Sequence, residues 1–365
     1  MLVWLPFLLR LENFLGIPLR NNGLQTVVSN YDGPLYIVVA KTLYSPSTIK
    51  ENFSFPLPIE YYSAHFPLFP LLIRLVSNFM YAPYAMLLIT IISAFLAHYF
   101  FFKLAHLYLD EKKSLILTTI FSIFPARWLI VRSVGSPEPL FVAFILASVY
   151  YFKNKKYLLS GIFGAGSQLT KSPGILLFVA FLIVWGIELL QKLSTVNQNF
   201  KYKLSLKVLP IFLIPGALLS VFYLYKVTFG DFAVYFKSGD NIHLFFPPFQ
   251  IFNYASPWVG TFWLEEIIFI YAFCLLGVIY LIKERDLVLG TFAAVFLSSL
   301  IFVSHRDLIR YALPVVPFIL ISFRKFLISK EFRIVLLFLI VPIYLFSLGF
   351  ISQNVMPIPN WSPLL

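Results

Sequence analysis

Residues 84–107, with the sequence YAMLLITIISAFLAHYFFFKLAHL, decide the fold class of this chain. The stretch contains no Asp, Glu, Lys or Arg before Lys103, and a helix that crosses a membrane needs about 20 predominantly apolar residues. The whole chain of 365 residues is 60% hydrophobic and only 12% charged, whereas soluble domains carry about 25% charged residues. We therefore predict a polytopic integral membrane protein that lies among membrane lipids.

Comparable apolar stretches recur along the chain. A weaker stretch at 2–18 is interrupted by Arg10 and Glu12, so it is either a broken first helix or the sequence that follows an upstream start. No soluble block is long enough for a second domain, so residues 1–365 are predicted to form a single transmembrane domain. The predicted fold is all-α, with about 10–12 transmembrane helices. The stronger candidates are 84–107, 114–131, 137–152, 157–171, 173–190, 208–227, 262–282, 287–303, 310–323 and 334–350.

Lys and Arg cluster in the loops between these stretches, and positively charged loops usually face the cytoplasm. Two candidate helices separate each successive pair of basic loops, so one orientation fits the whole chain. Residues 66–80 would invert that orientation if they crossed, and we predict that they form an amphipathic helix at the outer interface. The predicted cytoplasmic loops are 112–113, 153–156, 192–207, 283–285 and 324–333. The predicted outer segments are the first outer loop 19–83, the turns 132–139, 170–173 and 304–309, and the late outer loop 228–261.

The net charge of +12 follows from these loops, so it does not indicate a nucleic-acid partner. Cys274 is the one cysteine, which excludes an intramolecular disulfide. The five histidines show no HExxH pattern and no paired Cys/His spacing, so the sequence offers no zinc motif. The composition therefore points to membrane topology and not to a metalloprotein or a nucleic-acid-binding protein.

Charged residues gather at the predicted outer face, several of them within a residue or two of a helix end. Charge is costly to hold at such positions without a function. Together these residues could bind a phosphorylated lipid head group and activate a hydroxyl, or they could be solvated loop ends. They are Asp32, His65, Glu138, Lys171, Asp231, Asp240, His305, Arg306, Asp307 and Arg310.

Six short motifs surround these charges in a fixed order. They are Tyr31-Asp32-Gly33-Pro34-Leu35-Tyr36, which opens a short amphipathic stretch, His65-Phe66-Pro67-Leu68-Phe69-Pro70-Leu71, Pro137-Glu138-Pro139-Leu140-Phe141, Thr170-Lys171-Ser172-Pro173-Gly174, Phe229-Gly230-Asp231 and Arg310-Tyr311-Ala312-Leu313-Pro314. In order and rough spacing, from about residue 30 to 320, the set resembles the GT-C glycosyltransferases. Within them it most resembles the branch of the GPI-anchor second mannosyltransferase (PIG-V-like) and its prokaryotic relatives.

The chain departs from that family pattern at four positions. Tyr31 stands where Trp is usual, and His65 replaces the first Phe of an aromatic–proline element. Pro137 stands in place of Ser, and Lys171 in place of Arg. The acidic residues of the motifs are retained. The resemblance therefore implies a fold and a reaction class, and it leaves the sugar open between mannose and a similar hexose.

The resemblance implies transfer of a sugar from a polyprenyl-phosphate donor to a lipid or glycan acceptor, with inversion, on the non-cytoplasmic side of the plasma membrane or, in a eukaryote, of the endoplasmic reticulum. Such a displacement needs a carboxylate to take the acceptor's proton. It also needs cations to stabilise the departing phosphate. The resemblance places Asp32 as that base and Lys171 and Arg310, with Tyr311, at the donor phosphate. Glu138 would be a second catalytic carboxylate that orients the acceptor, holds a divalent cation or pairs with Lys171.

The remaining candidates, Tyr31, His65, Asp231 and Asp240, are placed at the acceptor or in loops beside it. The sequence names no certain cofactor and leaves the metal requirement open. Each main candidate also has a structural explanation. Asp32-Gly33 is common turn chemistry, Lys171 could be a snorkelling helix end, and Arg310 could anchor a helix boundary.

Two other classes of function compete with glycosyl transfer. A secondary transporter predicts inverted repeats and charges near the middle of the bilayer, whereas the charges here lie at one boundary and no repeat is visible. A lipid-linked glycan polymerase or ligase would share the lipid-phosphate chemistry but not the early Tyr31-Asp32 loop. A non-enzymatic scaffold would explain the composition and not the ordered motifs.

Overall fold

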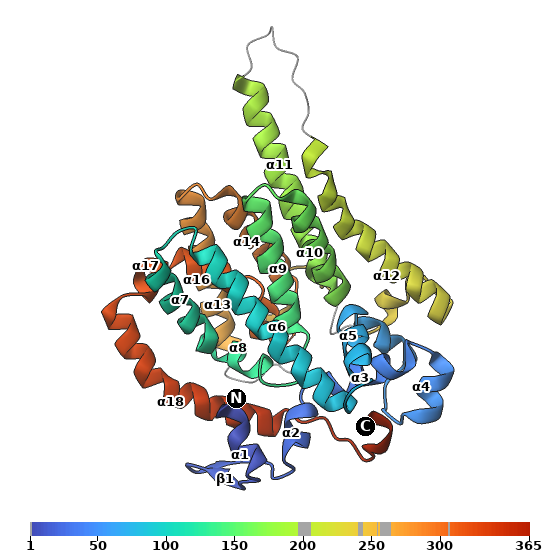
Figure 1. Ribbon diagram of the computed structural model, residues 1–365. Helices are drawn as coiled ribbons and strands as arrows, with labels where there is room; N and C mark the ends of the chain where they lie inside the picture. Colours follow the sequence, from blue (N-terminus) through green and yellow to red (C-terminus); the bar gives the residue numbers. More distant parts are fainter. Residues whose placement is uncertain (1, 196–205, 240–243, 254, 256–263, 306) are drawn as a thin grey trace. The chain divides into compact units, whose positions relative to one another are not determined.

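The apolar stretch that decides the fold class forms helix α6, Ala82–Ala105, in the computed structural model (Figure 1). Pro83 lies in its first turn, where the missing N–H costs no hydrogen bond. Apolar side chains surround the helix on all sides, which suits an environment of lipid and protein. The structure describes residues 2–195, 206–239, 244–253, 255, 264–305 and 307–365, and most of their regular structure is helical.

Within the described ranges, five helical stretches are long and apolar enough to cross a membrane. They are Ala82–Ala105, Ser172–Gln191, Lys207–Phe229, Glu265–Lys283 and Lys330–Gln353. A further apolar helix, Leu287–Leu300, is shorter. These stretches make the chain an integral, multi-pass membrane protein, as its composition predicts.

Two candidate helices of the sequence analysis are divided by proline. The stretch 114–131 forms α7, Glu111–Ile123, and α8, Ala126–Val131, on either side of Phe124-Pro125. The stretch 310–323 forms α15, Leu308–Ala312, and α16, Val316–Ser322, with Pro314 between them. Because proline lacks an N–H and its ring clashes with the preceding turn, it ends a helix at these places. The prediction of one continuous helix in each stretch was therefore wrong.

The first residues do not form one helix either. Short helices η1, Leu2–Trp4, and α1, Leu5–Leu8, precede a two-stranded antiparallel hairpin of β1, Asn13–Phe14, and β2, Ile17–Pro18. Residues 66–80, in contrast, form the short helix α5, Leu68–Val76. At about 1.5 Å per residue this helix is far shorter than the roughly 30 Å of a bilayer core. A short helix that does not cross agrees with the prediction for this segment.

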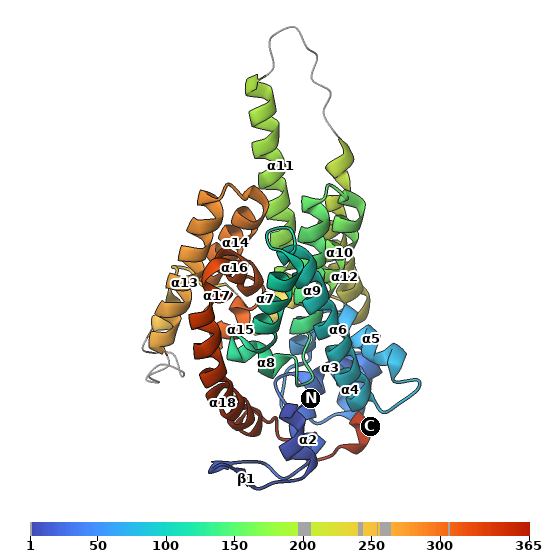
Figure 2. The same ribbon diagram turned by 60° about the vertical axis from the view of Figure 1, so that its left-hand side comes forward.

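The chain divides into two compact units, and the first contains residues 1–143, 221–242 and 324–365. In this unit α5 packs between α3 and α6, α7 packs on α6, and α8 packs on α18 (Figures 1 and 2). Its elements, besides those given above, are α2 (Leu24–Val28), α3 (Gly33–Thr42), α4 (Pro46–Asn52), η2 (Ile59–Ala64), η5 (Val234–Lys237), α17 (Arg324–Leu327), α18 (Lys330–Gln353) and η8 (Ser362–Leu364).

The second unit contains residues 144–220 and 243–323. In it α11 packs on α14, α13 packs on α14 and α16, and α10 packs on η4. The bounds are α10 (Tyr157–Thr170), η3 (Ser172–Gly174), α11 (Ile175–Thr195), η4 (Leu206–Phe212), η7 (Gln250–Phe252), α13 (Leu264–Lys283) and α14 (Leu287–Leu300). Helices α9 (Glu138–Lys153) and α12 (Leu213–Phe229) belong in part to each unit. The prediction of a single transmembrane domain stays a prediction.

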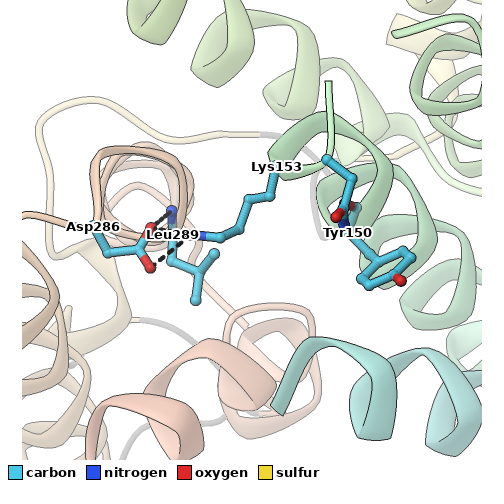
Figure 3. A network of polar contacts seen from close by, with 5 residues as sticks. Tyr150, Lys153, Asp286 and Leu289 are labelled. Carbon is cyan, nitrogen blue, oxygen red and sulfur yellow. Dashed lines mark hydrogen bonds and ion pairs between the residues drawn. The ribbon is translucent and has the colours of Figure 1, made fainter. Parts of the chain in front are cut away.

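Two of the basic loops meet at one end of the second unit. The Lys153 ammonium contacts both carboxylate oxygens of Asp286, at 2.9 and 2.8 Å (Figure 3). The same carboxylate accepts a hydrogen bond from the backbone N–H of Leu289, at 3.1 Å, and so caps α14. Because the Asp286 side chain is only 7% exposed, this ion pair is largely removed from solvent. Lys153 lies in the loop 153–156 and Asp286 directly follows the loop 283–285. The sequence predicts that these two loops lie on the same side of the membrane.

Candidate active site

Asp32 directly precedes α3 in the first unit, at the position that usually caps a helix. Its side chain nevertheless makes no capping hydrogen bond. The backbone completes the turn instead, because the Asp32 carbonyl accepts from the N–H groups of Leu35 and Tyr36 at 3.0 and 3.1 Å. The carboxylate is partly exposed. The turn therefore needs no hydrogen bond from this carboxylate. This weakens the explanation that Asp32 is present only because it favours a turn.

Tyr31 has a backbone conformation that is rare for an aromatic residue. Its φ of +49° lies in the left-handed region, and such a conformation persists only when surrounding contacts hold it. Arg127 supplies one contact, since its Nη1 donates to the Tyr31 hydroxyl at 3.2 Å. Phe350 supplies another, with its ring 5.7 Å from the Tyr31 ring and 3.9 Å below the Arg127 guanidinium. Residues from two distant parts of the sequence therefore fix the backbone next to Asp32.

The start of α3 also lies directly against the turn 132–139. A Cβ on Gly33 would come within 2.8 Å of the Val28 carbonyl oxygen and 2.9 Å of the Gly135 carbonyl oxygen. Thr90 on α6 fixes the same turn, because its hydroxyl exchanges hydrogen bonds with the Ser136 backbone at 3.3 Å. Only glycine allows so close an approach of two backbones. The first unit thus brings the start of the Asp32 motif into contact with the turn that leads to Glu138.

Glu138 begins α9 and is only 3% exposed. The Ser136 hydroxyl donates a hydrogen bond to Glu138 Oε2, and a carboxylate at a helix N-terminus is stabilised by the helix dipole. A glutamate that merely ended a loop would be solvated, whereas this one is buried and hydrogen-bonded. Its position suits a carboxylate that orients another group, one of the roles expected for it.

The remaining candidates of the first unit have local partners. His65 is 2% exposed, and its ring lies 4.7 Å from that of Tyr36 and 5.5 Å from that of Tyr61. Asp231 forms an exposed ion pair with Lys237 at 2.6 Å. The hydrogen bond from Lys237 lowers the pKa of Asp231, and the same contact raises the pKa of Lys237. Asp240 lies outside the described residues.

The second unit brings all three donor-phosphate candidates together around the Tyr311 ring. The Lys171 ammonium lies 5.9 Å from the ring centre and the Arg310 guanidinium 5.4 Å from it. The His305 ring lies 5.0 Å away. Arg310 Nε is also 3.5 Å from the Asp307 carboxylate. We call Lys171, His305, Arg310 and Tyr311 the Tyr311 cluster. Two cations beside one aromatic ring are side chains of the kind that bind phosphate.

Three further polar residues were not selected from the sequence. Arg127 interrupts a candidate membrane helix, and a charge inside such a helix is in itself a signal of function. Arg132 begins the turn 132–139, and burial lowers its pKa. Gln168 lies one turn before Lys171 and is fully buried, with no hydrogen-bond partner for its amide among the residues described. The sequence alone could not select Gln168, because a single amide in an apolar helix belongs to no recognisable motif.

The described residues contain no group of three or more His, Cys, Asp or Glu side chains that could hold a metal ion. In the first unit, the Ser136 hydroxyl donates to the Glu138 carboxylate and Lys237 pairs with the Asp231 carboxylate.

Comparison with known proteins identifies the fold. No family model matches the sequence, and no curated protein matches it. The crystal structure of ArnT from Cupriavidus metallidurans in the apo state matches with a TM-score of 0.55 at 13% sequence identity, over 93% of this chain. The chain spans about 61% of the length of that ArnT chain. These comparisons do not support the narrower PIG-V-like branch. The chain is a mostly helical, multi-pass membrane protein whose fold is similar to that of ArnT.

Proposed function

We propose that the protein is a membrane glycosyltransferase that moves a sugar from a polyprenyl-phosphate donor to a lipid or glycan acceptor. ArnT is a membrane glycosyltransferase of the GT-C type, and its fold is the fold of this chain. The observation that carries the proposal is the state of Asp32. Its carboxylate makes no capping bond, and the backbone on both sides is fixed by close contacts. A positioned carboxylate that the fold does not itself use is what a general base requires.

In the proposed reaction the acceptor hydroxyl attacks the anomeric carbon of the donor sugar. Asp32 takes the hydroxyl proton as the new carbon–oxygen bond forms. The bond from the anomeric carbon to the phosphate oxygen breaks at the same time, and the pair of electrons leaves with the lipid phosphate. A single displacement of this kind inverts the anomeric configuration. Glu138, fixed by Ser136, orients the acceptor.

The Tyr311 cluster stabilises the phosphate that departs. Arg310 can meet two phosphate oxygens at once, and Lys171 adds a point charge. The Tyr311 ring and Asp307 hold the Arg310 guanidinium before any substrate binds. Charge that is already in place costs no reorganisation during the reaction, which is the main advantage of such sites.

The transferred sugar is mannose or a similar hexose, and the reaction takes place on the non-cytoplasmic face of the plasma membrane or of the endoplasmic reticulum. The orientation rests on the basic loops and can be tested directly. In a Cys274→Ala background, single cysteines at the exposed Asn52 of the first outer loop and at the partly exposed Arg132, which begins the turn that leads to Glu138, should both react with an impermeant thiol reagent added outside. A cysteine at Asn154 should not react. Labelling of only one of the two outer positions would contradict a shared face.

The function itself is tested by incubating the purified protein with a panel of polyprenyl-phosphate sugars and measuring loss of the donor. The wild-type protein should consume at least one donor, and Asp32→Asn should consume it far more slowly. A secondary transporter, the competing class, would move a solute without consuming any donor. No consumption of any donor in the presence of lipid and glycan acceptors would contradict the proposal.

A further inference from the structure

A cavity of about 720 Å³ opens in the first unit between the first outer loop and the C-terminal segment. Part of one wall is Gln25 and Ser29, from α2 and the residue that follows it. A second wall is the stretch 50–56, and a third is the segment 355–364. In Figures 1 and 2 the C-terminal segment returns from α18 and ends near α3 and α4. The volume lies within the range of about 300–1,000 Å³ that small-molecule sites occupy.

Hydrogen bonds hold the C-terminal wall in place. The Met356 N–H donates to the Ser29 carbonyl at 2.8 Å, and Val355 pairs with Asn30 as an antiparallel bridge. Asn30 Nδ2 donates to the carbonyl of Ile351 at 2.9 Å. Pro357, Pro359 and Pro363 also line the cavity and restrict the backbone of this wall. The cavity is therefore a formed feature of the unit and not a gap beside a loose tail.

The side chains that line the cavity are of three kinds. Phe53, Phe55 and Trp361 present partly exposed aromatic rings, and Arg20, Lys50 and Glu51 carry charges of both signs. The third kind is the amide, from Asn22, Gln25, Asn52 and Asn360. Arg20 is fixed at the wall, because its Nε donates to the Ser352 carbonyl at 3.2 Å.

These three kinds of side chain together indicate which class of ligand the cavity can bind. An acyl chain would bury the amides and charges without partners, which is costly. A phosphate group would meet Glu51 as well as Arg20 and Lys50. A pyranose ring, in contrast, has apolar C–H faces that stack on aromatic rings. It also has adjacent hydroxyl groups that both donate to and accept from planar amides, carboxylates and guanidinium groups. The lining therefore fits a saccharide better than a lipid tail or an anion.

The cavity is connected to Asp32 by a short, fixed piece of chain. Ser29 lines the cavity and lies three residues before Asp32. Asn30, between them, donates from its side chain to the carbonyls of Thr26 and Ile351, at 2.8 and 2.9 Å. Tyr31 is held by Arg127 and Phe350.

We infer that this cavity is a saccharide-binding subsite, and that it holds the glycan portion of the acceptor. The second half of the inference rests on the proposed glycosyltransferase function. The first half does not, because saccharide binding can be measured without any turnover.

The test uses the full chain in lipid nanodiscs and three soluble probes: mannotriose, maltotriose and chitotriose. Binding is measured by saturation-transfer NMR and calorimetry. At least one probe should bind. Trp361→Ala should raise the Kd of that probe about tenfold, as expected for loss of one stacked ring. Phe79→Ala removes an aromatic ring that is 85% exposed and lies outside the cavity, and it should leave the Kd unchanged. Asn52→Ala and Glu51→Gln serve as second variants if Trp361→Ala lowers the melting temperature.

The outcomes separate this inference from the proposed function. Saccharide binding by a wild-type protein that consumes no donor would support the subsite and contradict the glycosyltransferase. Donor consumption without binding of any probe would overturn the subsite alone. Binding that inorganic phosphate displaces, and that depends on Arg20 and Lys50 but not on Trp361, would overturn the saccharide in favour of an anion. A Kd that responds equally to Trp361→Ala and Phe79→Ala would also overturn the inference.

Discussion

The two compact units position their candidate residues by different means. In the first unit, Asp32 is placed through the backbone: Gly33 lies against the Gly135 carbonyl, and Tyr31 is held in a left-handed conformation by Arg127 and Phe350. In the second unit, Lys171 and Arg310 reach the Tyr311 ring through long side chains, at 5.9 and 5.4 Å. The first unit thus positions the Asp32 carboxylate by close backbone packing, whereas the second unit positions two cationic side chains around the Tyr311 ring.

The difference matches the chemistry proposed for each set. A general base must lie within about 2.6–3.2 Å of the proton it takes, so a small shift removes its effect. The attraction between opposite charges falls only with the inverse of distance. A cation can therefore stabilise the phosphate from a longer and more variable distance. Changes in the first unit should therefore act through geometry, and changes in the second through charge.

The largest effect is expected from Asp32→Asn. Asn has nearly the same shape but cannot take a proton at neutral pH, so turnover of the donor should fall by about 10²–10⁴-fold. Folding should be little changed, because the turn is made by backbone hydrogen bonds. For the same reason Asp32→Ala should be equally inactive and nearly as stable. Sugar transfer and thermal stability in detergent would be compared for the three proteins. Wild-type turnover in the Asn variant would refute the assignment of the base.

The next largest effect is expected in the second unit. Lys171→Gln or Arg310→Gln should slow transfer by about 10²–10³-fold, because each removes a charge from the developing phosphate. The sign of the charge should matter more than its exact place, so Lys171→Arg should keep most of the activity. Rates and protein abundance would be measured together. Full activity in both Gln variants would return these residues to the role of helix anchors.

A structural effect is expected from Gly33→Ala in the first unit. The added Cβ would meet two backbone oxygens at 2.8 and 2.9 Å, and neither can rotate away. Forcing a methyl group into such a site costs about 1–3 kcal/mol, which a lower melting temperature would show. Gly186→Ala is the matched control, since a Cβ there meets nothing within 4 Å. Equal stability of the two variants would contradict the close packing of α3 on the turn 132–139.

The smallest effect is expected at Asp231, whose pKa the Lys237 hydrogen bond lowers. A group whose pKa is lower in the folded protein stabilises the fold above its unfolded pKa, and that contribution is lost as the pH falls. The melting temperature of Asp231→Asn should thus lie slightly below wild type at pH 7, and the difference should shrink as the pH falls below about 4, the ordinary pKa of an aspartate. Because both side chains are exposed, the effect should also shrink in high salt. A difference that grew as the pH fell would contradict this explanation.

The sequence alone determined the class of the protein. Membrane insertion depends on the summed hydrophobicity of some 20 consecutive residues, and that sum can be read locally, as at 84–107. The ordered motifs also predicted a helical glycosyltransferase-like fold, and the fold of the chain is similar to that of ArnT. The donor-phosphate candidates Lys171, Arg310 and Tyr311 were found in the same way, and the second unit places them together.

Only the tertiary structure decided how each candidate is held. The contact of Arg127 with Tyr31 joins residues 96 positions apart, and the cavity beside Ser29 is closed by the C-terminal segment. The sequence could not show that His65 lies among tyrosine rings or that Glu138 is buried against Ser136. Such contacts depend on which distant surfaces pack together, and residue type and local spacing do not contain that information. Hydrophobicity therefore determined that the chain lies in a membrane. Tertiary packing determined which candidate side chains are buried or hydrogen-bonded and which remain accessible.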